Sequence, residues 1–263
     1  MPVDIGPLRD DLAAESADLF ALLDGIPRDR WLLPTPAAGW TIADQVSHLA
    51  YFDVTTSQSI VDPDGFRAAA AKLTGAGDDF PDRVAADHRH LGATELLDWF
   101  RRSRMALLHD YANVDPATRL PWYGPDMGVA SSITARLMET WAHGQDVADT
   151  VHVRREPTGR LRHVADIGVR ALPYSFHVNH QVVPTEPIHV QLTGPHGDTW
   201  RWGDVDAPDR VSGTALDFCL VVTQRRHVAD TALAVSGATA TAWIAIAQAF
   251  AGPAGPGRER GFR

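Results

Sequence analysis

The sequence is poor in cysteine and has no long hydrophobic run. Its 263 residues include a single cysteine, Cys219, which excludes an internal disulfide and fits a reducing compartment. No apolar segment approaches the roughly 18–20 residues that a membrane span needs. The first five residues show neither a basic start nor an apolar signal core. We therefore expect a cytoplasmic protein with no membrane partner.

Positive charge is also scarce. The chain has 24 Lys and Arg against 33 Asp and Glu, which gives a net charge of -9. A protein that binds a phosphate backbone depends on a basic surface, so we expect no nucleic-acid partner. A small anionic substrate remains compatible, because single arginines can act within an acidic protein. The contents of 44% hydrophobic and 22% charged residues are those of an ordinary globular protein.

The first 150 residues or so have the periodicity of helices. Apolar residues recur at helical spacing, and they predict long helices over 7–24, 41–61, 94–113 and 130–150. A connector over 64–92 should contain one short helix, over 66–73. Thr41 is placed to cap the second long helix, and Asp62-Pro63-Asp64-Gly65 should end it. Four long helices predict a four-helix bundle, in which inward side chains from facing helices can build a metal site.

The pattern changes after about residue 152. Alternating residues over 188–192 and 199–202 predict two strands joined by a turn, followed by a helix over 214–224, a strand over 233–235 and a helix over 239–250. We therefore predict an α+β protein with a bundle over 1–152 and a small α/β domain over 153–251. The Gly- and Pro-rich residues 252–263 should form a flexible tail.

Three separated residues are the strongest candidates for chemistry. Glu139 and His143 are four residues apart, so they share one face of a helix, and His48 lies in the helix over 41–61. Two imidazoles and one carboxylate are typical of a catalytic zinc site, which keeps a fourth position open. Taken alone, His48 could be an ordinary core or surface histidine, and Glu139 and His143 could be an ordinary pair on a solvated helix face. Asp44 and Asp146, one turn from the histidines, could accept from an imidazole N–H, cap a helix or lie on the surface.

Two segments carry a resemblance to a known family. They read Trp40-Thr41-x-x-Asp44-x-x-x-His48-Leu49 and Arg136-Leu137-x-Glu139-x-Trp141-x-His143-x-x-Asp146. They resemble the DinB-like superfamily, more narrowly its mycothiol-dependent maleylpyruvate isomerase branch, and within it actinobacterial metal-binding proteins of largely unassigned function. The resemblance covers nearly the whole chain. It implies a metal-binding four-helix bundle followed by a small α/β domain, with His48, Glu139 and His143 as ligands of a divalent metal ion, expected to be zinc.

The resemblance also implies a low-molecular-weight thiol, mycothiol or a similar compound, as cosubstrate. In the isomerase branch the thiolate adds to an activated double bond, rotation follows and elimination regenerates the thiol, whereas related transferases keep the adduct. Arg225 matches the arginine of the C-terminal domain and would hold a substrate carboxylate. Arg226 could replace it, and both could simply counter the helix dipole. Gln224 stands where that branch usually has Gly, so the isomerase substrate is not carried over.

No internal nucleophile stands out. Cys219 lies in an apolar helical run and is predicted to be a buried packing residue, so a thiol mechanism needs an external thiol. Trp122 and Tyr123 precede the last long helix and could wall the site or pack in the core. We expect a metal-dependent enzyme that uses a thiol for isomerisation or S-transfer on a small, acidic electrophile. The alternatives are a hydrolase or lyase that activates water and a non-catalytic metal-binding module.

Overall fold

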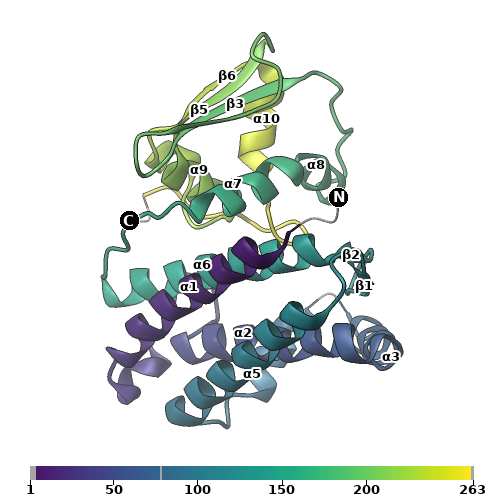
Figure 1. Cartoon of the computed structure of the whole chain (residues 1–263). Helices are drawn as coiled ribbons and strands as arrows, with labels where there is room; N and C mark the ends of the chain where they lie inside the picture. The colour runs from purple at the N-terminus through teal and green to yellow at the C-terminus, as the bar shows by residue number, and fades with distance from the viewer. Residues whose placement is uncertain (1–3, 78, 262–263) are drawn as a thin grey trace. The chain divides into compact units, whose positions relative to one another are not determined.

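A computed structural model describes residues 4–77 and 79–261 and divides the chain into two compact units. The first unit comprises residues 1–154 and the second residues 155–263. The first is built mainly of helices, and the second combines helices with a sheet (Figure 1). This is the α+β architecture that the sequence predicts. Among the described residues, no helix is both long and apolar enough to cross a membrane.

Four long helices form the first unit. They are α1 (Gly6–Asp24), α2 (Ile42–Val61), α5 (Ala93–Asn113) and α6 (Val129–Val151). Both α1 and α2 pack against both α5 and α6, which makes the four-helix bundle expected from the apolar periodicity. The shorter elements of this unit include η1 (Arg28–Leu32), β1 (Arg119–Leu120) and β2 (Met127–Gly128). Strands β1 and β2 pair antiparallel just before α6.

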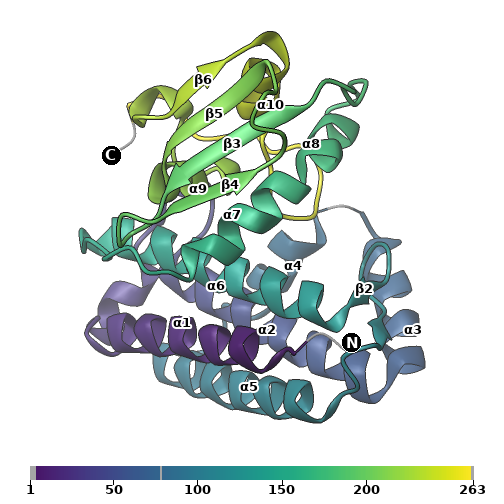
Figure 2. The same cartoon turned by 45° about the horizontal axis from the view of Figure 1, so that its top comes forward.

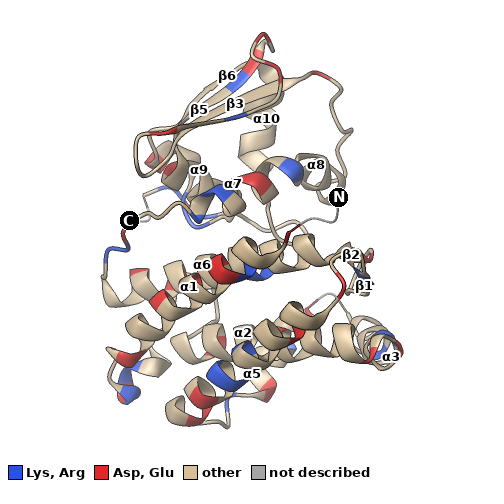
Figure 3. Ribbon diagram, viewed as in Figure 1, with Lys and Arg blue, Asp and Glu red and all other residues tan. Residues whose placement is uncertain are grey.

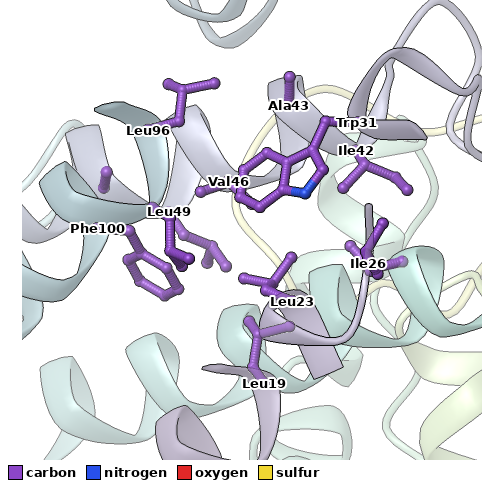
Figure 4. Close-up of a cluster of buried hydrophobic side chains, with 13 residues drawn as sticks. Leu19, Leu23, Ile26, Trp31, Ile42, Ala43, Val46, Leu49, Leu96 and Phe100 are labelled. Carbon is purple, nitrogen blue, oxygen red and sulfur yellow. The ribbon is translucent and has the colours of Figure 1, made fainter. Parts of the chain in front are cut away.

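The bundle buries an apolar cluster centred on Trp31 (Figure 4). The indole of Trp31 is 1% exposed and lies among the side chains of α2 and the loop after α1. Leu19 and Leu23 of α1 and Leu49 of α2 belong to the same cluster. On α5, buried Leu96, Leu97 and Phe100 join it, while exposed acidic and basic residues are interspersed along the helix (Figure 3). Burial of apolar area at about 25 cal/mol per Å² is the main stabilising contribution of such a cluster.

The connector between α2 and α5 contains two helices, where the sequence predicts one. They are α3 (Pro63–Thr74) and α4 (Phe80–Asp87). The run Asp62-Pro63-Asp64-Gly65 ends α2, as predicted, but it also begins α3. The side chain of Asp62 accepts a hydrogen bond from the Gly65 backbone N–H, and Pro63 occupies the first turn, where its missing N–H costs nothing. A motif that breaks one helix here caps the next.

The second unit contains a four-stranded sheet in the order β4-β3-β5-β6 (Figure 2). Its elements are α7 (Leu161–Arg170), α8 (Leu172–Val178), β3 (Ile188–Thr193), β4 (Thr199–Trp202), β5 (Asp209–Thr214), α9 (Ala215–Val222), η2 (Val228–Asp230), β6 (Ala234–Ser236) and α10 (Ala238–Ile246). Strand β3 pairs antiparallel with β4 and parallel with β5, and β5 pairs antiparallel with β6. The predicted strands and helices of this unit are present, with ends shifted by a few residues.

Four elements described in this unit are additions to the sequence prediction: α7, α8, β5 and the short η2. Helix α7 buries Leu161, Val164, Ala165 and Gly168, a helical spacing that the sequence contained. A Cβ at Gly168 would lie 2.7 Å from a methyl carbon of Val222, so this glycine permits the close approach of α7 to α9.

The residues expected to form a flexible tail make hydrogen bonds within the second unit. The Gly252 backbone N–H donates to the Tyr174 hydroxyl at 2.8 Å, and the Gly255 N–H donates to the side chain of Gln248 at 3.0 Å. The Gly261 N–H donates to Asp230 at 2.7 Å. Residues 252–261 therefore lie against this unit, and residues 262 and 263 of the expected tail lie outside the described residues.

Candidate metal centre

The start of α2 fixes the position of His48. Thr41 and Asp44 form a capping box, in which the Thr41 backbone N–H donates to Asp44 at 2.8 Å and the Thr41 hydroxyl accepts from the Asp44 N–H. Asp44 also pairs with Arg89, with Nε 2.9 Å from a carboxylate oxygen. Of the roles considered for Asp44, the structure therefore shows helix capping. His48 follows in the second turn of the helix, facing inward.

The structure brings His48, Glu139 and His143 together. The candidate ligand atoms of the three residues all lie within 4.8 Å of one another. Nε2 of His143 is 3.0 Å and Nε2 of His48 is 3.4 Å from the same carboxylate oxygen of Glu139. Ligands bound about 2.0–2.1 Å from a tetrahedral zinc ion lie roughly 3.3 Å apart, so these separations fit a shared ion. The donor set and its spacing both suit a divalent metal.

His143 has a second polar partner, which the sequence analysis missed. Its Nδ1 atom hydrogen-bonds the side-chain oxygen of Gln45, three residues before His48 on α2. Metal-binding histidines usually donate their other ring N–H to such an acceptor. A polar residue one turn from His48 was the available signal, although the sequence pointed instead to Asp44 and Asp146.

Two aromatic side chains flank the imidazoles. The ring of Trp40 is stacked on His143, with centroids 5.8 Å apart and planes inclined by 12°. Phe52, one turn after His48 on α2, lies 4.5 Å from the His48 ring centroid. The side chains of His48 and His143 are 10% and 11% exposed, and that of Glu139 is 20% exposed. The cluster is thus largely shielded from water, with the carboxylate as its most accessible member.

Burial and the neighbouring charges set the protonation states. Burial, followed by the proximity of His143, lowers the pKa of His48 to about 3. Burial alone would raise the pKa of Glu139, but hydrogen bonds with His143 and His48 hold it well below its usual range. Near neutral pH the site therefore contains a neutral imidazole at His48 and an ionised carboxylate. These are the protonation states in which histidine and glutamate bind metal ions.

A buried ion network connects the helices that carry the candidate ligands. Asp53 of α2 accepts hydrogen bonds from Arg104 of α5 and from Arg136 of α6. The hydroxyl of Thr140, next to Glu139 on α6, accepts from Arg104 at 3.0 Å. The sequence did not reveal this network, because Asp, Arg and Thr are also common at solvent-exposed positions of helices. It links α2, α5 and α6 close to the candidate metal ligands.

The aromatic pair before α6 packs close to the site. Tyr123 lies 5.6 Å from Phe52 between ring centroids, and Trp122 stacks on Phe66 at 6.0 Å. The sequence left two roles open for Trp122 and Tyr123, forming a wall of the site or packing in the core. In the structure both residues pack within an aromatic cluster. The cluster reaches His48 through Phe52.

The residues singled out in the second unit occupy the end of α9. Cys219 is fully buried, as predicted, and burial raises the pKa of its thiol well above the usual range. Gln224 ends the helix in the left-handed conformation, with φ of 58°, and its amide donates to the Ala247 carbonyl. Glycine is the usual residue in that conformation just after a helix. The replacement of the family's usual Gly by Gln224 therefore lies at the end of a helix. The half-buried Arg225 donates to the Thr223 carbonyl at 2.6 Å, and its substrate role stays a prediction.

Comparisons with known proteins agree with this architecture. Residues 12–148 match the model of the mycothiol maleylpyruvate isomerase N-terminal domain, and residues 184–235 match a model described as wyosine base formation. Two uncharacterized proteins of Mycobacterium tuberculosis, from strains CDC 1551 and H37Rv, are each 48% identical over 259 residues, covering 97% of this chain and 99% of theirs.

Two crystal structures share the fold. One is a mycothiol-dependent maleylpyruvate isomerase, with a TM-score of 0.61 and 12% identity, covering 89% of this chain and 93% of that chain. The other is a histidine-to-alanine mutant of such an isomerase, with the same TM-score and 13% identity, covering 90% of this chain and 94% of that chain. At this level of identity the likeness concerns the fold.

Proposed function

This chain belongs to the mycothiol maleylpyruvate isomerase N-terminal domain family, and on that premise we propose that it is a metal-dependent, thiol-using enzyme. His48, Glu139 and His143 hold the metal ion, with zinc as the expected metal. The observation that carries the proposal is the convergence of these three side chains within 4.8 Å in the family's own domain. Two imidazole nitrogens and one carboxylate leave a tetrahedral ion with one position for a further ligand.

The surroundings of the three ligands suit chemistry on a thiol. A bound divalent ion supplies positive charge that favours the thiolate form of a coordinating thiol at neutral pH. Trp40 and Phe52 cover the imidazoles and keep water from them. Glu139 is the most exposed of the three ligands, which favours approach of a small molecule from its side.

The thiol comes from outside the protein. Cys219 is the chain's single cysteine, its side chain is buried, and its Sγ atom donates to the Leu161 carbonyl at 3.4 Å. A thiol with its pKa raised by burial is a poor nucleophile. A low-molecular-weight thiol of the mycothiol type therefore serves as cosubstrate.

The reaction is isomerisation or S-transfer on a small electrophile. In isomerisation, a carbon–sulfur bond forms at an activated double bond, the carbon–carbon bond rotates, and the carbon–sulfur bond breaks, so the thiol is recovered. In S-transfer the adduct is released and the thiol is consumed. Arg225 is proposed to bind a carboxylate of the electrophile, because a guanidinium grips a carboxylate through two hydrogen bonds.

Calorimetry with mycothiol tests the thiol proposal. Purified protein should contain about one zinc or other divalent ion per chain, and it should bind mycothiol only when the metal is present. S-methyl mycothiol is the matched ligand that lacks the thiol, and it should bind weakly. Metal-loaded protein without affinity for mycothiol or glutathione would favour the water-activating hydrolase, and protein that binds no divalent metal would refute the proposal.

Kinetics test the proposed role of Arg225. With maleylpyruvate, the substrate named for the structural relatives, or another acidic electrophile that the enzyme converts, Arg225→Ala should raise KM more than it lowers kcat. Arg226→Ala removes the neighbouring arginine, the alternative candidate for this role, whose guanidinium donates to the Arg225 carbonyl at 2.7 Å, and it should leave KM unchanged. A KM unchanged in Arg225→Ala, or raised equally in Arg226→Ala, would contradict the assignment.

A further inference from the structure

We infer that Gln45 is a positioning residue that fixes the tautomer of His143 and thereby directs the Nε2 lone pair of His143 to the metal position. The inference rests on the proposed metal site, although Gln45 is itself no ligand. It concerns a buried side chain on α2 that meets a ligand of α6 across the bundle.

The side-chain amide of Gln45 offers two different ends to its neighbours. Its oxygen only accepts hydrogen bonds, whereas its NH₂ group only donates. Gln45 is fully buried, so water does not substitute for its partners. Whichever end meets Nδ1 of His143 therefore decides whether that nitrogen carries the proton.

Thr35 determines the orientation of the amide. The Thr35 hydroxyl lies 2.9 Å from the Trp40 carbonyl oxygen, to which it donates its single hydrogen. It can then only accept from Gln45, whose Nε2 lies 2.8 Å away. With its NH₂ group turned to Thr35, Gln45 presents its oxygen to His143, and Nδ1 of His143 must be the donor.

This tautomer leaves Nε2 of His143 with a lone pair. That nitrogen lies 3.0 Å from a carboxylate oxygen of Glu139. A doubly protonated ring would donate a hydrogen bond to this oxygen, but in the neutral ring with its proton on Nδ1 two acceptors face each other. A cation shared by the two atoms turns this repulsive contact into an attractive one. The opposite tautomer would place a proton on Nε2, satisfy Glu139 with a hydrogen bond and block the ligand position.

Trp40 contacts both Thr35 and His143, the two ends of this chain of hydrogen bonds. Its carbonyl receives the Thr35 hydrogen bond, and its indole is stacked on the His143 ring. The hydrogen bonds therefore fix which nitrogen is protonated, and the stacked indole fixes the plane of the ring. Together they prepare His143 for the metal before the metal binds.

Zinc affinity measured by chelator competition tests this role. Gln45→Met keeps the size of the side chain but removes the acceptor, and it should weaken zinc binding by about 10–100-fold. Gln45→Glu keeps an acceptor at the same place and should restore the affinity. The matched control is Gln248→Met, which removes a buried glutamine of the second unit. It should lower the melting temperature without changing the zinc affinity.

The tautomer can be read directly by ¹⁵N NMR on metal-free protein at pH 8, above the usual histidine pKa of about 6.5. His143 should carry its proton on Nδ1, and Gln45→Met should increase the population protonated on Nε2. If that variant does not fold, Thr35→Val, which removes the hydroxyl that accepts from Gln45, should shift the same equilibrium. Nε2 protonation in the wild type, or a wild-type zinc affinity in Gln45→Met, would overturn the inference. Wild-type protein without zinc affinity would refute the proposed metal site, and the tautomer measurement would still decide the role of Gln45.

Discussion

Asp53 of α2 and Arg104 of α5 form a fully buried bidentate ion pair. Arg104 Nε lies 2.7 Å from one carboxylate oxygen and Nη2 lies 3.0 Å from the other. Arg136 of α6 donates to the same carboxylate at 3.2 Å, and all three side chains are at most 3% exposed. One carboxylate thus pairs with two guanidinium groups between three of the helices of the bundle, among them both helices that carry the candidate metal ligands.

Removing Asp53 should destabilise the first unit severely. Asp53→Ala leaves two buried guanidinium groups without their carboxylate, which typically costs about 3–5 kcal/mol of unfolding free energy. Urea denaturation followed by circular dichroism measures the loss. Asp126→Ala is the control, because it breaks an exposed bidentate pair with Arg67, and it should change stability little. Equal effects of the two substitutions would contradict the importance of the buried network.

The proposed metal site should be dispensable for folding. His143→Ala should abolish zinc binding yet leave the helical circular dichroism largely intact, because the apolar cluster around Trp31 does not include the ligands (Figure 4). His90→Ala, at an exposed position, should change neither property. Global unfolding of His143→Ala would show that the metal is structural.

The long helices could be predicted because their signals are local. Helix α2 has a capping box at its first residues and an apolar stripe behind it, and both can be recognised without tertiary structure. Helix α3 was predicted to begin three residues too late, because Asp62 and Pro63 have a double role as helix end and helix start. Strand β5 contains Gly213, with φ of 152°, and has a weak alternation. Its pairing with β3 and β6 depends on segments distant in sequence.

The site shows the same division between local and distant signals. Glu139 and His143 share a helix face, and their spacing together with the family resemblance indicated the three ligands that now lie together. Their joint function as a metal site remains the proposal made above. Gln45 was missed because its partner, His143, is 98 residues away in sequence. Asp53 was missed for the same reason, since only packing across the bundle places both arginines beside it.

Cys219 should be inert towards thiol reagents in the folded protein. Its side chain is fully buried and burial raises the pKa of the thiol, so both access and thiolate formation are suppressed. Ellman's reagent should release almost no colour from native protein and about one equivalent per chain in denaturing urea. Cys219→Ser should keep the thiol-dependent activity. Rapid native labelling, or a serine variant that folds but is inactive, would contradict the requirement for an external thiol.

The stability of zinc-free protein should fall as the pH is lowered from 6.5 towards 3. His48 has its pKa lowered to about 3 in the folded protein, from 6.5 as its ordinary value. Between these values the unfolded chain binds a proton that the folded chain excludes, so protonation favours unfolding. Above pH 6.5 the histidine is neutral in both states and contributes no pH dependence. The lowered pKa of Glu139 acts in the same direction, because its ionised form is the one that the folded protein stabilises.

Urea unfolding at a series of pH values, in the presence of a chelator, measures this effect. The His48→Asn variant should lose less stability than the wild type as the pH falls. The control variant His90→Asn should behave as the wild type. An equal loss in wild type and His48→Asn would mean that burial of His48 does not govern its protonation.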